Sequence, residues 1–330
     1  MTEAIKKSKV TGTRLKIIAM VTMFIDHFAA IFIDNVLAAL VPGNTGSPAY
    51  EQYMTEHPRI ALLGLLMGAM RLIGRCGFPL FAFLLTEGFE HTRSRLKYAL
   101  NLAVFALISE IPFNLGFYSR VFAPFYQNVF LTLLLGLLCL VCIEYLSKKK
   151  LLKAAEPFFY LSAAIFGIFT AYMAFKSENV RHFVTLSPKM FQFACLALAV
   201  VFALAAFFAG GRISRESMWT FVGNVCPIML FAYTADLLKT DYGSWGVVTI
   251  AVMYIFRKNR KTAFALGCLS LTLMYFIEAA AFFMLFPIAK YNGERGMKIN
   301  KYVFYVFYPV HIGLLYILTY LLHFTTFSVR

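Results

Sequence analysis

Long apolar runs, separated by short polar segments, fill the chain from one end to the other. Each run is close to the roughly 20 apolar residues that a helix needs to cross the hydrocarbon core of a membrane. The pattern therefore predicts an all-α, polytopic membrane protein with about ten transmembrane helices in a single domain, residues 1–330. The expected spans are 15–41, 61–90, 98–118, 127–147, 157–175, 190–210, 217–238, 243–257, 262–288 and 302–324.

The composition excludes other classes of protein. Of the 330 residues, 60% are hydrophobic and 14% are charged, against roughly 25% charged residues in an average soluble domain. A soluble domain could not bury this much apolar surface, and a disordered tail or a disulfide scaffold would contain far less of it. The six cysteines all lie in apolar runs, so we interpret them as small core residues and not as disulfide partners or metal ligands.

The net charge is +15, from 31 Lys and Arg against 16 Asp and Glu. In a soluble chain such an excess suggests nucleic acid. In a membrane protein, Lys and Arg concentrate in the cytoplasmic loops, where they also interact with anionic lipid. The basic clusters fall on alternate loops, and they lie inside if the N-terminus is cytoplasmic. We therefore expect a multi-pass protein of the cell membrane, with a cytoplasmic N-terminus, that contacts lipid and no nucleic acid.

One loop is an exception to this charge pattern. The segment 290–301 is expected outside, yet it is rich in Lys and Arg. Either a span is miscounted or the loop is basic for a reason of its own. The segment 243–257 is short for a full crossing, so it is the first candidate for a miscount.

The second span, 61–90, would be about 45 Å long as a straight helix, which exceeds a hydrocarbon core of about 30 Å. Gly74, Gly77 and Pro79 lie in its middle. Because proline cannot donate a backbone hydrogen bond to the preceding turn, we expect a kink or a break there.

Several ionisable residues lie within the expected spans, where each charge costs about 2.5–3.5 kcal/mol near the bilayer centre. At 1.5 Å per residue, one group of them falls roughly 14–21 Å into its spans, near mid-membrane. Such residues are functional or paired by default, and this group can form one buried polar site. Its members are Asp26, His27, Arg71, Arg75, Glu110 and His311.

His27 is the strongest candidate for a catalytic base. Asp26 and His27 are consecutive, so they point about 100° apart on a helix and cannot partner each other. We expect Glu110, from another helix, to orient the imidazole, and Asp26 to face Arg71 or Arg75. The structural alternatives are a hydrogen-bonded core histidine and a buried ion pair that fixes helix register.

Arg71 and Arg75 are four residues apart and share one helix face, so they repel each other unless anions lie nearby. Protein carboxylates could supply these anions, and so could a phosphate-bearing ligand, which a guanidinium binds with two hydrogen bonds. At the inner end of the same span, Glu87 lies near Arg93 and Arg95. This rim is either an interfacial cap or a place where the phosphates of a nucleotide-like donor bind.

Many of these residues lie in blocks that resemble the TraX family. The blocks appear in family order and cover nearly the whole chain, apart from 150–235 and the loop 42–59. They are LKIIAM (15–20), IDH (25–27), RLIGR (71–75), FPLFAFLL (78–85), EG (87–88), SEIPFN (109–114), NVFLT (128–132), DYG (241–243), NGERG (292–296) and FYPVH (307–311).

The resemblance implies an integral-membrane acyltransferase with an acyltransferase-3-like helical bundle. The member that gives the family its name acetylates the N-terminal amine of conjugative pilin. Relatives in the wider group move acetyl groups from cytosolic acetyl-CoA to sugars across the membrane. A histidine in the first span is their suspected catalytic group, and His27 is its match here. The acceptor stays open: a protein N-terminus, a glycan or a small molecule.

These considerations predict transfer of an acyl group, in the simplest case acetyl, from acetyl-CoA to an amine or hydroxyl, without a metal. A homodimer is compatible with this prediction. The alternative is a proton-coupled membrane transporter, since mid-membrane carboxylate, His and Arg side chains also describe a proton relay. An inverted repeat would favour that class, and the sequence shows none. The expected catalytic residues are His27, Glu110 and Asp26; the donor-binding residues are Arg71, Arg75, Arg93, Arg95 and Arg295; and the acceptor-binding residues are His311, Tyr308 and Asp241.

Overall fold

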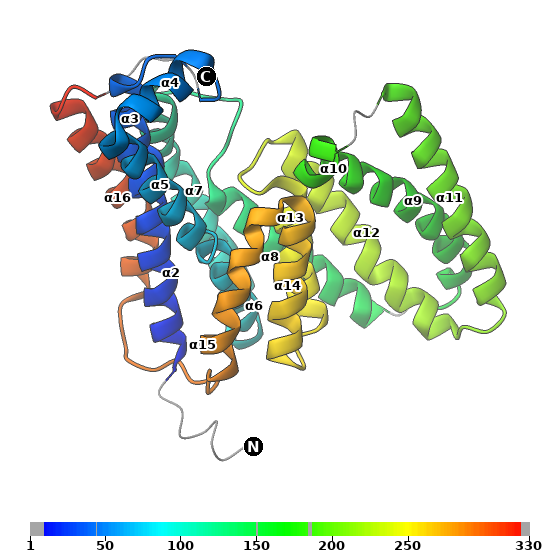
Figure 1. The fold of residues 1–330 in the computed structure, drawn as a ribbon. Helices are drawn as coiled ribbons and strands as arrows, with labels where there is room; N and C mark the ends of the chain where they lie inside the picture. Colours follow the sequence, from blue (N-terminus) through cyan, green and yellow to red (C-terminus); the bar gives the residue numbers. More distant parts are fainter. Residues whose placement is uncertain (1–9, 44, 150, 184–186, 325–330) are drawn as a thin grey trace. The chain divides into compact units, whose positions relative to one another are not determined.

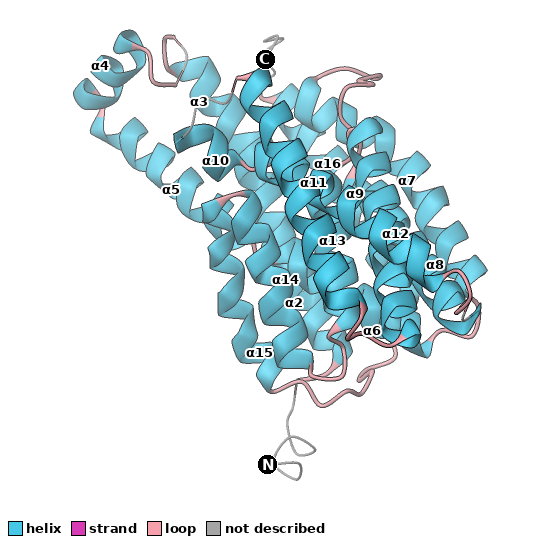
Figure 2. Ribbon diagram, turned by 90° about the vertical axis from the view of Figure 1, so that its right-hand side faces the viewer, coloured by secondary structure: helices cyan, strands magenta, loops and turns pink. Residues whose placement is uncertain are grey.

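The computed structural model describes residues 10–43, 45–149, 151–183 and 187–324, and this part of the chain is almost entirely helical (Figure 1, Figure 2). Within it, the β structure is an isolated bridge between Val10 and Tyr291. Eight helical stretches of this part are long and apolar enough to cross a membrane, and two shorter apolar segments accompany them. The prediction of an all-α, polytopic membrane fold is therefore confirmed.

The helices in chain order are α2 (Gly12–His27), η1 (Phe28–Ile33), α3 (Asp34–Leu40), α4 (Pro48–Glu56), α5 (Pro58–Gly74), α6 (Gly77–His91), α7 (Arg95–Tyr118), α8 (Val129–Lys149), α9 (Ala155–Lys176), α10 (Glu178–Phe183), α11 (Pro188–Gly210), α12 (Arg215–Leu237), α13 (Gly243–Ile255), α14 (Arg260–Met274), η2 (Phe276–Met284), α15 (Leu285–Ala289) and α16 (Lys301–Leu321). They divide between two compact units. The described residues of 1–84, 101–130 and 280–330 form the first unit, and those of 85–100 and 131–279 form the second.

In the first unit, α2 packs against α5 and α16, and the π-helix η1 packs against the same two helices. In the second unit, α9 packs against α11 and α12, and α13 packs against α12 and α14. Small residues permit this close packing in the second unit. A Cβ at Gly167 of α9, for example, would overlap the backbone of Leu198 in α11.

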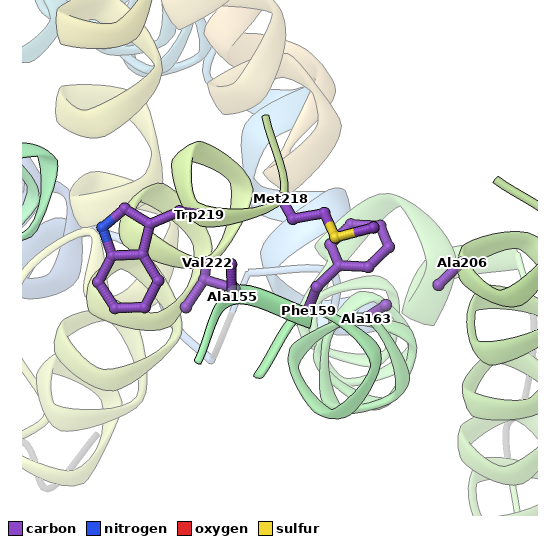
Figure 3. Packing of buried hydrophobic residues seen from close by; sticks show 7 residues of the cluster. All are labelled: Ala155, Phe159, Ala163, Ala206, Met218, Trp219 and Val222. Carbon is purple, nitrogen blue, oxygen red and sulfur yellow. The ribbon is translucent and has the colours of Figure 1, made fainter. Parts of the chain in front are cut away.

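A cluster of buried side chains joins three helices of the second unit (Figure 3). Trp219 of α12 also donates from its indole Nε1 to the carbonyl of Leu146, 2.9 Å away. This satisfies the polar atom of an otherwise buried ring. The cluster consists of Ala155, Phe159 and Ala163 from α9, Ala206 from α11, and Met218, Trp219 and Val222 from α12.

The predicted interruption of the second span is present. Helix α5 ends at Gly74 and α6 begins at Gly77. Pro79 lies in the first turn of α6, where a backbone N–H has no partner within the helix. The long apolar run 58–91 is therefore two helices, and the turn between them consists of Arg75 and Cys76.

The basic loop 290–301 lies against the first residues of α2. Gly12 N donates to the carbonyl of Glu294 at 2.8 Å, and the amide and hydroxyl of Thr13 donate to the carbonyl of Arg295 at 2.9 and 2.7 Å. Figure 1 shows this loop, between α15 and α16, at the same end of the first unit as the start of α2. The two segments are on one side of the membrane, and the expectation that they lie on opposite sides is wrong.

The expected span 262–288 is interrupted in the structure. Helix α14 ends at Met274, Tyr275 is extended (φ −151°, ψ 126°), and the 3₁₀ helix η2 begins at Phe276. The apolar run therefore contains two helical segments with a break between them. The hydropathy pattern could not separate them, because the residues at the break are themselves apolar or aromatic.

Two polar side chains stabilise this break, one from Ser177 between α9 and α10 and one from Asn179 in α10. Ser177 Oγ donates to the carbonyl of Leu273 at 2.5 Å, and Asn179 Oδ1 accepts from Phe276 N at 2.7 Å.

Candidate functional site

Two histidines from opposite ends of the chain form the centre of the site. His27 is the last residue of α2 and His311 lies within α16. His27 Nδ1 is 2.7 Å from His311 Nε2, and the two rings are nearly parallel, with 5° between their planes. His311 is buried, and its Nδ1 lies 2.6 Å from the carbonyl of Phe307. A continuous hydrogen-bonded chain therefore runs from a backbone carbonyl through His311 to His27.

This chain fixes the tautomers of the neutral pair. The carbonyl of Phe307 can only accept, so His311 Nδ1 carries the proton and His311 Nε2 accepts. His27 Nδ1 must then donate, which leaves the lone pair of a neutral His27 on Nε2. No group in the described part of the chain hydrogen-bonds to His27 Nε2. The arrangement presents that nitrogen as a base.

The backbone departs from regular α-helical bonding on both sides of the pair. The π-helix η1 begins directly after His27, and π-helical turns occur frequently at functional sites. In α16, Pro309 has no N–H, so the carbonyl of Tyr305 lacks the usual hydrogen bond from four residues onward. These local irregularities lie within one turn of each histidine.

Aromatic rings surround the histidine pair. The ring of His27 meets those of Phe117 and Tyr308 edge-on, with centroids 5.4 and 5.7 Å apart. Phe307 stacks on His311 at 4.5 Å. The polar pair therefore lies in a largely apolar environment, in which electrostatic interactions are stronger than in water.

Asp26 pairs with the two arginines of α5 and its C-terminal turn. Its Oδ2 is 2.5 Å from Arg71 Nη1, and its Oδ1 is 3.7 Å from Arg75 Nη2. Gly74 makes this approach feasible, since a Cβ there would overlap the Asp26 carboxylate. The sequence left two sources of anions for these arginines, and pairing with a protein carboxylate is the one present here. The Asp26–arginine cluster adjoins the histidine pair, because Asp26 directly precedes His27 in α2.

Glu110 has a different partner from the one that we expected. Its Oε2 accepts from Asn128 Nδ2 at 2.5 Å, and Asn128 also donates to the carbonyl of Ala106. His311, and not Glu110, is the group at His27 Nδ1. Near Glu110 in α7, Ser109 Oγ and Asn114 Oδ1 are buried and make no hydrogen bond within the described residues. This side of α7 therefore holds polar atoms with unused hydrogen-bonding capacity.

The residues expected to bind the donor are divided between the two units. Arg93 is exposed in the second unit, whereas Arg95 contacts Glu144 and lies over the ring of Phe89 at 4.3 Å. That pairing favours the structural alternative of an interfacial cap for Arg95. Arg295 belongs to the first unit, in loop 290–301, where its Nη2 donates to the carbonyl of Ile299 at 3.3 Å.

The residues expected to bind the acceptor are divided in the same way. His311 and Tyr308 are at the histidine pair itself. Asp241 lies in the second unit, and its carbonyl accepts from the hydroxyl of Thr132. It is followed by Tyr242 and Gly243, both with positive φ (62° and 47°).

Sequence reasoning did not select Asn128, Phe117 or Phe307. Asn128 is the first residue of the NVFLT block and had a signal that could have been used, because a fully buried amide needs partners. Phe117 and Phe307 had none, since aromatic residues are abundant throughout this chain, which contains 36 Phe.

Comparison with known proteins agrees with this architecture. The chain is 23% identical over 320 residues to a protein of Dichelobacter nodosus described as a probable fimbrial assembly protein FimC, serogroup H1, and the match covers 92% of this chain and 93% of that protein. No solved structure matches the chain. The model of the TraX protein family matches residues 11–223 and 182–319, which include both histidines and the Asp26–arginine cluster, and the chain therefore belongs to the TraX family.

Proposed function

We propose that this protein is an integral-membrane acyltransferase that transfers an acyl group, acetyl in the simplest case, from cytosolic acyl-CoA to an amine or hydroxyl. The observation that carries the proposal is the base nitrogen of His27. Its ring is fixed by His311 in an apolar environment and lies beside a guanidinium cluster. A base of this kind removes the proton of an incoming nucleophile.

In the proposed reaction, His27 Nε2 takes a proton from the acceptor nitrogen as that nitrogen attacks the thioester carbonyl. The new N–C bond forms, and the C–S bond breaks when the tetrahedral intermediate collapses. The leaving CoA thiolate takes the proton from the His27 imidazolium and becomes free CoA. A hydroxyl acceptor would react in the same way through its oxygen.

We assign Arg71 the role of stabilising the negative charge of the tetrahedral intermediate. A guanidinium has five N–H donors, and Arg71 uses one of them on Asp26. Asp26 holds the guanidinium in position, so we assign Asp26 a positioning role. Glu110 and Asn128 then provide polar groups on the α7 side for the acceptor.

The acceptor that we favour is the N-terminal amine of a membrane-inserted, pilin-like subunit. The similar protein of D. nodosus is described as a fimbrial assembly protein, and a reaction centre near mid-membrane suits an acceptor that is itself embedded in lipid.

The test uses the purified full-length protein in proteoliposomes with acetyl-CoA labelled in the acetyl group and pilin-like subunits inserted in the same vesicles. We expect label on the subunit amine and release of one CoA per label, and neither with His27→Gln. Equal transfer by the variant would overturn the role of His27. Proton-driven solute uptake without consumption of any acyl-CoA would favour the transporter class instead.

A further inference from the structure

The half-buried cations of the described membrane helices pair with carboxylates, but Lys16 of α2 is an exception. Lys16 is half-buried, and no carboxylate of the described residues lies within ion-pair distance of it. A cation within a membrane span normally has a partner. The paired cations include Arg71 with Asp26, Arg95 with Glu144, and Lys176 with Asp236.

The surroundings of Lys16 contain further positive charge. Its Nζ lies 5.0 Å from the centroid of the Phe304 ring in α16, so the side chain faces α16 and not the lipid. The neighbouring loop adds a further cation, Arg295, whose carbonyl accepts hydrogen bonds from Thr13, three residues before Lys16. We call Lys16, Arg295, Lys298 and Lys301 the basic loop cluster. None of the four forms an ion pair with the described part of the chain.

The loop that carries three of these residues is firmly held. Backbone hydrogen bonds join it to the start of α2, and the Arg295 guanidinium is fixed by the carbonyl of Ile299. Gly296 has φ +80°, and a Cβ there would overlap Thr11, so this close approach requires glycine. Membrane topology requires positive charge on a loop but not a defined conformation. The defined conformation of this loop therefore exceeds what topology requires, and it suits the binding of an anionic ligand.

The cluster is aligned with the histidine pair along two helices. Lys16 precedes His27 by 11 residues in α2, which is about 16 Å, and Lys301 precedes His311 by 10 residues in α16, which is about 15 Å. A ligand bound between these ends needs phosphates at one end and a reactive group at the other. The phosphates and thioester of an acyl-CoA are separated in this way by the pantetheine arm.

We infer that the basic loop cluster holds the diphosphate and 3′-phosphate of the acyl-CoA donor, and that the pantetheine arm follows the α2–α16 contact to His27. The inference rests on the proposed function and adds the donor site to it. It also places the loop on the cytosolic face, where acyl-CoA is present. The competing source of the same chemistry is the phosphate of an anionic lipid headgroup.

The first experiment measures CoA binding by calorimetry to the full-length protein in phosphatidylcholine nanodiscs. We expect Arg295→Gln/Lys298→Gln to weaken binding by about tenfold or more, since charge-assisted hydrogen bonds to phosphate are lost. The matched control is Lys258→Gln/Lys261→Gln, which removes two exposed cations, one between α13 and α14 and one in the first turn of α14, and should stay within about twofold of wild type. Equal weakening in both variants, or no change in the first, would overturn the inference.

Further measurements separate misfolding, lipid binding and failure of the proposed function. The charge-conserving Arg295→Lys/Lys298→Arg variant should retain CoA binding, and adenosine 3′,5′-bisphosphate should compete with CoA. A loss of phosphatidylserine binding with CoA binding intact would assign the cluster to lipid and overturn the donor site. Acyl transfer with an unchanged KM for acetyl-CoA in Arg295→Gln/Lys298→Gln would overturn only this inference. Absence of CoA binding and of transfer by wild type would overturn the proposed function.

Discussion

The Nδ1 atom of His27 and the Nε2 atom of His311 lie 2.7 Å apart, although 284 residues separate them in the chain. The hydrogen bond makes the first and last described membrane helices parts of one site. It also gives the two rings different roles, because only His27 has a nitrogen without a hydrogen-bond partner among the described residues.

Replacing His27 tests the base directly. His27→Gln keeps hydrogen-bonding capacity and approximate size but cannot take a proton at neutral pH. We expect kcat to fall by about 10²–10⁴-fold. The variant should still bind CoA and should remain folded in detergent. Wild-type activity should also fall toward acid pH, since the base must be unprotonated. A purely structural histidine would instead lower yield, and residual activity would follow the folded fraction.

His311 should act through His27. His311→Phe keeps an aromatic ring but removes the acceptor for His27 Nδ1, so the tautomer is no longer fixed, and we expect kcat to fall by about tenfold or more. His311→Gln offers a carbonyl oxygen as acceptor and should recover part of that loss. The comparison of kcat and of pH–rate profiles checks this role. Equal turnover by the two variants, after correction for folded protein, would contradict it.

The ion pair between Asp26 and Arg71 should contribute to stability. Removing one partner of a buried pair leaves an uncompensated charge, which costs about 3–5 kcal/mol. Asp26→Asn and Arg71→Gln should therefore each lower the thermal stability of the purified protein. The double variant should be less destabilised than the sum of the single effects. Additive effects would mean that the two side chains do not interact in the membrane.

Gly74 offers a test with a matched control in the same helix. A Cβ at Gly74 would overlap the Asp26 carboxylate, whereas a Cβ at Gly68 meets no heavy atom within 4 Å. Gly74→Ala should lower stability by about 1–3 kcal/mol through overpacking. Gly68→Ala should be neutral or stabilising by about 0.5–1 kcal/mol, as expected for helical Gly→Ala changes. Thermal unfolding in detergent would compare the two, and an equal response would exclude a specific contact at Gly74.

Cysteine labelling tests the topology. An impermeant thiol reagent should label Lys298→Cys in loop 290–301 from the same side of the membrane as Lys258→Cys. It should label Thr45→Cys, in the connection between α3 and α4, from the opposite side. Wild type controls for the native cysteines. Labelling of position 298 together with position 45 would restore the ten-span arrangement and contradict the break at Tyr275.

The fold class was predictable because the thickness of the hydrocarbon core sets the length of the apolar runs in the sequence. The interruption before Pro79 was also predictable, since the missing N–H of proline is a local property. The break at Tyr275 was not. It depends on Ser177 and Asn179, which are nearly 100 residues earlier and carry no periodic signal.

The site was predictable as a set of residues more than as a set of contacts. Placing an ionisable side chain near mid-membrane costs free energy, so such residues are good candidates for a functional site. This argument selected Asp26, Arg71 and both histidines. It cannot assign partners, because helix rotation decides which residues meet. We expected Glu110 to orient His27, but Glu110 and His311 lie at similar expected depths, and only the packing of α16 against α2 shows that His311 is the partner.

The break at Tyr275 has a consequence for the bilayer itself. Helix α14 has 15 residues, or about 22 Å, and the segment after the break is of similar reach, whereas a typical hydrocarbon core measures about 30 Å. Short hydrophobic segments draw the two lipid leaflets toward each other. The membrane beside these two short segments is therefore expected to be thinner than its surroundings, which shortens the apolar barrier between the two aqueous phases.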